Sequence, residues 1–321
     1  LTRFDENSKV IVVEGPIQSG KTAFAKELAR QLDMHHIPDA NMDMLYINQY
    51  GYDMRQLDDR LPESTRSFDE KNFCRDPKHT NAAAFQIWMY RLRFSLYIDA
   101  LTHVLNTGQG VVIQRCPWSD SVFMDAMASQ RYVSEGALGA YNQIVKHTLS
   151  VLMKPHLVIY LDVPADRVLE NIKKKGEPFE KEGKALTKAY LHDLENNWKN
   201  KFLKEVSINS ELVMYDWSNG GDVEAVVEDL ERIDFDRFTK HDAKLQDWRK
   251  WREQEWSDTR IMYTNNKASL MSLFNIPIYD VPELLVNGED LKEFNDVWYS
   301  VSNITKHGLV PRKINETNLC I

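Results

Sequence analysis

Cysteine is scarce in this sequence, and the few cysteines exclude several classes of protein. The 321 residues contain three of them, at Cys74, Cys116 and Cys320. Their spacing fits neither a zinc site nor a redox pair, and so sparse an odd number argues against a disulfide framework. The chain also lacks the cysteine set of an iron–sulfur protein and the glycine fingerprint of a dinucleotide-binding protein. We therefore expect no iron–sulfur cluster and no flavin.

Long apolar runs and an excess of positive charge are also missing. No run approaches the ~18 apolar residues that a membrane span needs. The formal net charge is −8, whereas nucleic-acid-binding proteins need clustered lysine and arginine. The composition therefore predicts a globular protein without a membrane span and without nucleic acid as a partner. The first ten residues resemble neither a signal nor a transit peptide, so we expect any targeting segment to be absent from this chain.

Short apolar runs alternate with helical patterns over most of the chain. The runs are rich in β-branched residues and predict buried strands at residues 8–15, 110–115, 155–164 and 211–217. Helical spacing of apolar residues predicts helices after Gly20 and at residues 81–106, 119–153, 166–175, 185–206 and 223–233. This alternation predicts an α/β fold of the P-loop NTPase type, a parallel sheet with helices on both faces.

The pattern changes near residue 235, where strand signals become few. We therefore predict a P-loop domain over residues 1–234 and a mainly helical and irregular C-terminal extension over residues 235–321. The extension contains Trp248, Trp251 and Trp256 amid charged residues. Tryptophan and arginine are enriched at interface hot spots, and Trp248 and Trp251, three residues apart, are expected to share a face of a helix. The extension is thus predicted to make assembly contacts, with docking onto its own body as the open alternative.

One motif carries a defined chemistry. Gly15, Gly20, Lys21 and Thr22 fit the pattern G-x-x-x-x-G-K-[ST], with Ser19 inside the loop, and the motif follows a predicted strand and opens a predicted helix. Its glycines let backbone N–H groups face phosphates, the lysine neutralises them, and the threonine hydroxyl is a ligand for Mg²⁺. These residues predict a site for a purine nucleotide (ATP or ADP, GTP or dGTP) with Mg²⁺.

The order of motifs resembles the deoxyribonucleoside kinase family over residues 9–233. The P-loop comes first, and "IPDA" at 37–40 resembles the family's Pro-Glu-Pro segment. "FQIWMYRLRF" at 85–94 resembles the helix that reads the base, and "QRCPWSD" at 114–120 resembles the Glu/Asp-Arg-Ser motif. "PHLVIYLDVPADRVLENIKKKG" at 155–176 resembles the strand and helix that lead into the lid over the nucleotide.

This resemblance implies roles for three further residues. Asp39 matches the acid that serves as general base toward the 5′-hydroxyl of a nucleoside, and Arg115 matches the catalytic arginine. Gln86 matches the glutamine that reads the base. Gln86 and Arg115 therefore join the P-loop residues in the predicted nucleotide site, and Asp39 and Arg115 are the catalytic candidates if the protein is active.

Several positions depart from the kinase pattern. Asp39 is one methylene shorter than the family's glutamate, Gln114 replaces the acid before the arginine, and Cys116 replaces the serine. The lid offers Lys173–Lys175 and no arginine, and lysine lacks the planar fork that binds a transferring phosphoryl group. Since phosphoryl transfer is almost all positioning and electrostatics, these departures predict nucleotide binding with slow or absent transfer.

Structural interpretations stay open beside the functional ones. Gln86 lies in a long predicted helix and is equally suited to a buried hydrogen-bond network. Asp39 follows a proline and suits a turn or a helix N-cap. The lysines at 173–175 suit a solvated helix face. Asp162 ends a predicted strand at the edge of the sheet where ligands bind, and we interpret it as structural.

The kinase-like body together with an extension that contains "FNIPIYDVPEL" at 274–284 resembles the accessory subunits of mitochondrial respiratory complex I that carry a kinase fold. This resemblance implies a non-catalytic part of an NADH dehydrogenase complex, which supports assembly and stability and takes no part in electron transfer. It implies a peripheral place on the matrix side of the inner membrane, beside membrane-arm subunits. The alternatives are an active deoxynucleoside or nucleotide kinase that transfers phosphate from ATP, and a P-loop protein of another task.

Overall fold

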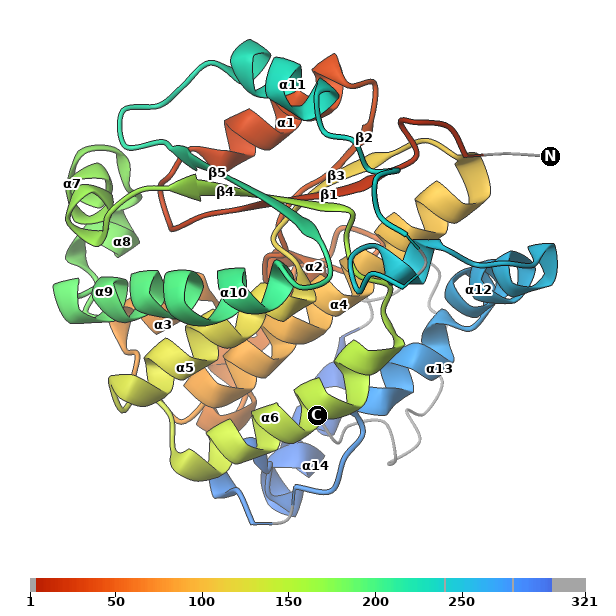
Figure 1. Cartoon of the computed structure of the whole chain (residues 1–321). Helices are drawn as coiled ribbons and strands as arrows, with labels where there is room; N and C mark the ends of the chain where they lie inside the picture. The colour runs from red at the N-terminus through yellow and green to blue at the C-terminus, as the bar shows by residue number, and fades with distance from the viewer. Residues whose placement is uncertain (1–3, 240, 279, 302–321) are drawn as a thin grey trace.

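A parallel five-stranded sheet forms the centre of the protein (Figure 1). The computed structural model describes residues 4–239, 241–278 and 280–301, so Cys320 lies outside the described residues. The strand order is β2-β3-β1-β4-β5, and the four pairings between these strands are all parallel. The strands are β1 (Val10–Glu14), β2 (His35–Ile37), β3 (Val111–Gln114), β4 (Leu157–Asp162) and β5 (Glu211–Asp216).

The fold class and four of the strands are confirmed, whereas β2 was missed. It is three residues long and contains two histidines, so it has no apolar run that would mark a buried strand. It pairs with β3 alone and forms one edge of the sheet. An edge strand needs little apolar surface, and its backbone pairing with β3 is enough to place it.

Helices cover both faces of the sheet because the side chains of each strand alternate between them. One face packs against α1 (Lys21–Gln31) and α11 (Val223–Glu231), through residues such as Ile11 and Val13 of β1. Val10 and Val12 point to the opposite face and its larger core. The helices there are α4 (Ala82–Thr107), α5 (Ser121–Ser129), α6 (Glu135–Thr148), α9 (Lys188–Asn197) and α10 (Leu203–Val206).

Some predicted helices are interrupted. The predicted helix at residues 185–206 is α9, a π-helical turn at Trp198–Phe202 and α10. The lid segment, residues 171–190, joins the end of α7 (Ala165–Lys175) to α9 and contains the short helix α8 (Pro178–Glu182). Short 3-10 turns lie at Met54–Arg60, Glu63–Thr65, Pro117–Asp120, Leu149–Val151, Gln246–Trp248, Ser272–Phe274 and Pro282–Leu284.

The described part of the extension packs against the body. Tyr263, Leu270 and Phe274 are buried in the same core as α4. Trp248 stacks on His156, with 4.0 Å between ring centroids, and its indole Nε1 donates to the Lys154 carbonyl at 2.7 Å. Trp248 therefore docks onto the protein's own body, the alternative left open above. The helices here are α12 (Glu253–Asn265), α13 (Lys267–Met271) and α14 (Gly288–Ser300).

The expectation that Trp248 and Trp251 share a helical face is wrong. Trp248 ends a 3-10 turn, and Trp251 precedes α12. The Trp251 side chain is 74% exposed, whereas Trp248 is partly buried. The backbone turns between the two residues, so Trp248 packs against the body and Trp251 lies at the surface.

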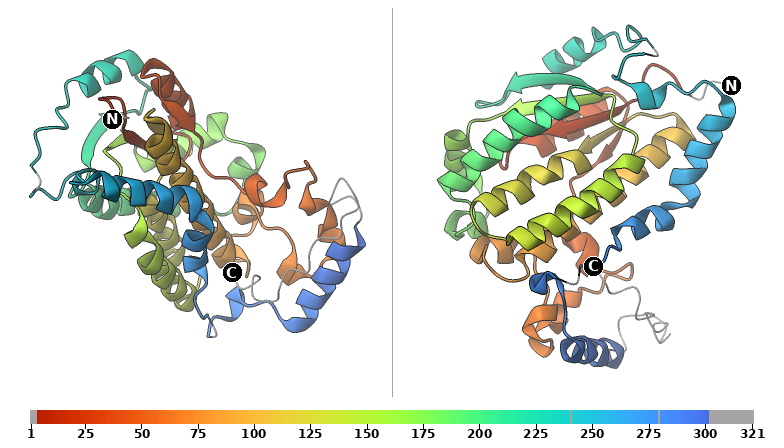
Figure 2. Two further views of the ribbon diagram at one scale, coloured as in Figure 1. Left: turned by 90° about the vertical axis from the view of Figure 1, so that its right-hand side faces the viewer. Right: turned by 60° about the horizontal axis from the view of Figure 1, so that its bottom comes forward.

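A third, smaller cluster joins α14 to the segment between β2 and α4. Phe294 and Trp298 of α14 pack on Leu57 and Leu61. Figure 2 shows α14 beside this segment. That segment also contains α2 (Asp43–Tyr46) and α3 (Glu70–Arg75). No helix within the described ranges has the length and apolar character to cross a membrane. The domain division at 234/235 stays a prediction.

Candidate functional site

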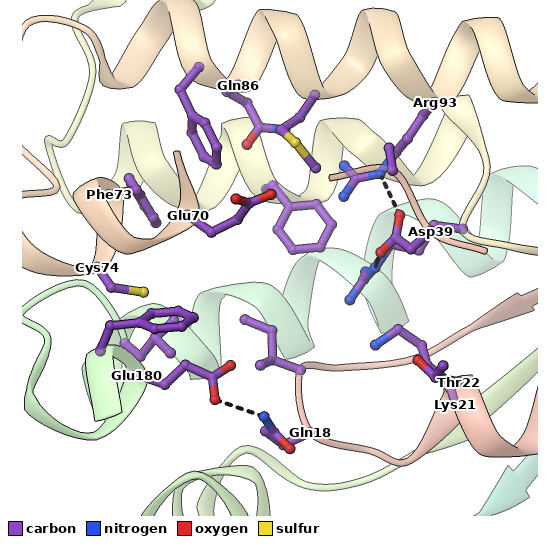
Figure 3. A pocket seen from close by; sticks show the side chains of 18 of the residues that line it. Gln18, Lys21, Thr22, Asp39, Glu70, Phe73, Cys74, Gln86, Arg93 and Glu180 are labelled. Atoms are coloured by element: carbon purple, nitrogen blue, oxygen red, sulfur yellow. Dashed lines mark hydrogen bonds and ion pairs between the residues drawn. The ribbon is translucent and has the colours of Figure 1, made fainter. Parts of the chain in front are cut away.

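A cavity of about 570 Å³ opens beside the P-loop (Figure 3). Its walls come from the P-loop and α1, from the segment after β2, from α3 and α4, and from the lid segment. Six of the predicted site residues line it: Gly20, Lys21, Thr22, Asp39, Gln86 and Arg115. The fold therefore brings together residues that lie nearly a hundred positions apart in the sequence.

The P-loop has the backbone that its glycines were expected to allow. Gly20 has φ of +83°, a left-handed conformation that costs glycine little, and α1 begins at the next residue. At Gly15 a Cβ atom would lie 2.9 Å from the Leu161 carbonyl oxygen, so only glycine fits against β4. The N-terminus of α1 thus faces the cavity, where its free N–H groups and helix dipole favour an anion.

Lys21 supplies a positive charge at the base of the cavity. Its side chain is buried, and its Nζ donates to the Pro16 carbonyl at 3.0 Å. Burial, reinforced by the charge of Arg115, lowers the pKa of Lys21 to about 7, although Asp39 and Glu14 act in the opposite direction. A buried lysine at the N-terminus of a helix is suited to an anionic group such as a phosphate.

A neutral hydrogen-bond chain occupies the place predicted for a metal-binding acid. Thr22 Oγ1 donates to Gln114 Oε1 at 3.0 Å, and Gln114 Nε2 donates to His36 Nε2 at 2.9 Å. The acceptor role of His36 requires a neutral ring, and burial lowers its pKa. Gln114 is 2% exposed, so its amide is fixed between these two partners.

Asp39 is held between two arginines. Its Oδ1 accepts from Arg93 Nε at 3.2 Å and its Oδ2 accepts from Arg115 Nε at 2.8 Å. Burial alone would raise the pKa of Asp39, but the charges of Arg93, Arg115 and Lys21 outweigh it and leave the pKa below its ordinary value. Asp39 is therefore an ion-paired carboxylate and caps no helix.

Arg93 was missed by the sequence analysis. It lies seven residues after Gln86 on α4, about two helical turns, so both side chains reach the same wall of the cavity. Its guanidinium also pairs with Asp120, a fully buried carboxylate. An arginine two turns from a candidate ligand-reading glutamine was the signal that could have identified it.

Gln86 belongs to a buried network as well as to the cavity wall. Its Nε2 donates to Asp120 Oδ1 at 2.9 Å, and the Tyr141 hydroxyl donates to the same oxygen at 2.7 Å. The structural interpretation of Gln86 is thus realised, while its reading of a base stays a prediction. Asp162 similarly has a structural partner, Lys199, at 3.0 Å.

The lid segment presents an acid and apolar side chains to the cavity. Glu180 accepts from Gln18 Nε2 at 2.7 Å, which ties the lid to the P-loop, and Phe179, Leu186 and Tyr190 also line the cavity. The lysines at 173–175 are exposed on the last turn of α7 and are absent from the described cavity lining. They form a solvated helix face, the second of the two interpretations given above.

Comparison with known proteins agrees with this geometry. The family model "Deoxynucleoside kinase" matches residues 11–251. A relative from Mus musculus, "NADH dehydrogenase [ubiquinone] 1 alpha subcomplex subunit 10, mitochondrial", is 37% identical over 287 residues, which cover 88% of this chain and 76% of the relative. The chain belongs to the deoxynucleoside kinase family and, within it, to the family of this subunit 10. The two resemblances inferred from the sequence are thereby confirmed.

Relatives named as kinases are more distant. "Deoxyguanosine kinase" from Dictyostelium discoideum is 25% identical over 228 residues, covering 71% of this chain and 70% of that protein. The structure of a deoxyadenosine kinase from M. mycoides with bound dCTP has a TM-score of 0.52 at 17% identity, and covers 70% of this chain and 100% of its own. This last similarity shows the fold alone.

Proposed function

We propose that this protein is a non-catalytic accessory subunit of mitochondrial respiratory complex I whose kinase-like body retains a nucleotide site. The relative named as a complex I subunit matches more of the chain, at higher identity, than the relative named as a kinase. In this role the protein supports assembly and stability of the complex and transfers no electrons. It sits peripherally on the matrix side of the inner membrane, against membrane-arm subunits.

The loss of catalysis rests on one observation, the engagement of both Asp39 oxygens by arginines. A general base needs an oxygen within hydrogen-bond reach of the hydroxyl and a pKa close to the working pH. Arg93 and Arg115 occupy the two oxygens and hold the pKa of Asp39 below its ordinary value, although burial alone would raise it. The carboxylate is therefore a weak acceptor for a proton from a nucleoside hydroxyl.

Two further features of the cavity support this conclusion. Gln114 places an amide where the kinase motif has an acid, and the lid segment presents Glu180 where a transferring phosphoryl group requires positive charge. Phosphoryl transfer depends on positioning and on neutralising the transferred group. A glutamate on the cavity side of the lid and a neutral partner for Thr22 both oppose it.

Nucleotide binding makes fewer demands, and the P-loop meets them. The N-terminus of α1 and the buried Lys21 face the cavity, and they need no proton transfer or metal to attract phosphates. We propose a purine nucleoside di- or triphosphate as the ligand, read in part by Gln86. Its occupancy would stabilise the body, because a ligand that binds only the folded state raises stability.

The outer surface of the extension supports a role in assembly. The described part carries exposed apolar side chains: Ile261 is 44% exposed, Leu285 50%, Val286 41% and Tyr299 39%. Contiguous exposed apolar groups are typical of interaction surfaces, and these residues are the candidates for such a surface on the extension. We propose that residues 235–321 hold the body on one side, through Trp248 and Tyr263, and contact complex I neighbours on the other.

The alternative function is that of an active deoxynucleoside kinase. The observation in its favour is that Lys21, Asp39, Gln86 and Arg115 all line one cavity. This alternative requires release of Asp39 from at least one arginine when substrate binds. A transfer assay separates it from the proposal, as set out at the end of the Discussion.

The assembly role can be tested with surface variants. Truncation near Ile233 is unsuitable, because it removes Tyr263 and Phe274 from the main core. We instead use two double variants of the full chain. The extension variant carries Ile261→Glu and Leu285→Glu, and the control carries Ile208→Glu and Met214→Glu. The control residues are 59% and 49% exposed on the body.

The proposal expects the wild type and the control to comigrate with complex I on a native gel and the extension variant to migrate free. Each purified variant is checked for an unchanged melting temperature, so that unfolding is not mistaken for lost contacts. Wild-type protein that never enters the complex contradicts the proposed subunit role. An extension variant that enters the complex as well as the control does contradicts the role assigned to the extension.

A further inference from the structure

The P-loop motif implies Mg²⁺ beside Thr22, and the chemistry of the surrounding donors tests whether it fits. Magnesium requires hard oxygen ligands in near-octahedral geometry, and proteins usually contribute one or two carboxylates together with substrate phosphates. At Thr22 the hydroxyl donates to the amide oxygen of Gln114, and that amide is in turn fixed by His36. An amide contributes no negative charge, so the side-chain partner of the Thr22 hydroxyl offers no charge to a cation beside it.

The acidic side chains that line the cavity have other partners. Three such residues occur in the described lining, and Asp39 is paired with the two arginines. Glu70 accepts from the Met42 backbone N–H at 3.2 Å, and Glu180 accepts from Gln18 at 2.7 Å. Among the described residues, no group of three or more His, Cys, Asp or Glu side chains could hold a metal ion.

Glu14 ends β1 below the P-loop and is likewise unsuited to a metal. It is fully buried, and one of its oxygens accepts from the Cys116 N–H at 2.9 Å. Burial raises the pKa of Glu14, the opposite of what a metal-binding carboxylate requires. It is absent from the residues that line the cavity within the described chain. The donor set as a whole does not fit a divalent cation.

Positively charged side chains line the cavity where a kinase would use a divalent cation. Arg115 lines the cavity, is 4% exposed, and has Nη1 buried without a hydrogen-bond partner among the described residues. Its guanidinium lies over the rings of Phe123 and Trp198, at 4.6 Å and 5.3 Å from their centroids. An arginine keeps its charge when buried and offers a planar fork that fits phosphate oxygens.

Ser19 adds a further donor within the P-loop. Its Oγ is buried and has no hydrogen-bond partner in the part of the chain that the structure describes. Ser19 lies next to the lining residues of the cavity and is not one of them in the described chain, whereas Lys21, Arg115 and the N-terminus of α1 line it. The cavity therefore has cationic donors, and its acidic groups are engaged.

We infer that the protein binds its nucleotide without a divalent cation, with Lys21 and Arg115 neutralising the phosphates and Gln114 keeping Mg²⁺ from Thr22. This inference rests on the nucleotide binding proposed above. It assigns Gln114 a positive role, the exclusion of the metal, where the kinase pattern has an acid. Metal exclusion also separates binding from transfer, since a nucleotide without Mg²⁺ is a poor phosphoryl donor.

The test is a calorimetric titration of the full chain with ATP, GTP and dGTP, in excess EDTA and in millimolar Mg²⁺. The inference expects the dissociation constant in EDTA to equal or fall below the value in Mg²⁺, because Mg²⁺ competes for the free nucleotide. Binding that is ~10-fold or more weaker in EDTA, a loss of about 1.4 kcal/mol, overturns it while leaving the proposed function intact. No binding in either buffer overturns the proposed nucleotide site itself.

Two variants assign the effect to the residues named. Gln114→Glu should bind more weakly than wild type in EDTA and regain affinity in Mg²⁺, whereas the exposed Gln56→Glu should behave as wild type. Thr22→Val guards against a misfolded Gln114 variant, and it should shift affinity equally in both buffers. A Thr22→Val effect confined to Mg²⁺, or a folded Gln114→Glu chain without any response to Mg²⁺, contradicts the inference.

Discussion

The two walls of the cavity differ in how far they keep the kinase pattern. The P-loop wall, residues 15–22, matches its motif at every defined position and adopts the expected backbone. Gln114, which accepts from Thr22 behind that wall, replaces an acid of the kinase pattern. On the opposite wall Asp39 is held by two arginines, and the lid offers Glu180. Binding needs only fixed donors, whereas transfer also needs a free base and charge that stabilises the transition state. Under the proposed function, one wall is retained for binding while the residues of the other serve the structure.

Arg93 offers the largest effect on the opposite wall. Arg93→Met leaves Asp39 with one partner and leaves the fully buried Asp120 without its ion pair. Removing one member of a buried ion pair costs about 3–5 kcal/mol of unfolding free energy. Urea denaturation of the variant should show this loss. Arg91→Met on the same helix, whose arginine lies over Trp88 and Phe274, should cost clearly less, and equal losses would contradict the assigned network.

Lys21 tests the P-loop wall. Lys21→Ala removes a charge-assisted contact of about 1.5–3 kcal/mol, so nucleotide affinity should fall about 10- to 100-fold. The exposed Lys26→Ala, on the same helix, should leave affinity within about 2-fold, since surface charges contribute little. Calorimetric titration with ATP or dGTP measures both. Equal affinity of wild type and Lys21→Ala would mean that phosphates bind elsewhere.

The smallest expected effect is a pH dependence of stability, to which Lys21 of the P-loop wall contributes and Asp39 of the opposite wall does not near neutral pH. In the folded protein, burial lowers the pKa of Lys21 to about 7, whereas an unfolded lysine keeps its proton to about pH 10.4. Between these values the unfolded chain binds more protons, so the contribution of Lys21 makes stability rise with pH. The slope is at most about 1.4 kcal/mol per pH unit.

Thermal unfolding of nucleotide-free wild type and Lys21→Met at several pH values from 7 to 9 tests this slope. The measured quantity is the difference in stability between the two proteins at each pH. The wild type should gain stability relative to the variant as pH rises. The difference in stability between wild type and Asp39→Asn should stay nearly constant in this range, because the pKa of Asp39 lies below its ordinary value and its contribution is lost only at acid pH. A wild-type curve parallel to that of Lys21→Met would contradict a buried, neutralisable Lys21.

The sequence predicted the parts of the molecule that local patterns determine. Apolar runs located β1, β3, β4 and β5, and the glycine–lysine–threonine spacing located the P-loop. Strand β2 was missed because three residues with two histidines carry no apolar signal, and pairing with β3 places them. Likewise Trp248 is held by tertiary contacts with His156 and Lys154, which the local sequence does not reveal.

The same distinction applies to the candidate site. Lys21, Thr22, Asp39, Gln86 and Arg115 came from motifs, and the fold places all of them at one cavity. Their partners could not be predicted from motifs, because pairing across the cavity depends on the folded chain. Arg93, which determines the state of Asp39, and Glu180, which ties the lid to the P-loop, follow from three-dimensional contacts alone.

The most direct test of the central claim is a phosphoryl-transfer assay on the full chain. Purified protein is saturated with γ-labelled ATP or GTP, with and without Mg²⁺, and offered the four deoxynucleosides, while binding of the same nucleotide is measured in parallel. The account predicts that nucleotide binds and that no labelled deoxynucleoside monophosphate forms in single-turnover conditions. Transfer at ~1 per second, the low end for kinases, would contradict it and establish the opposite wall as catalytic.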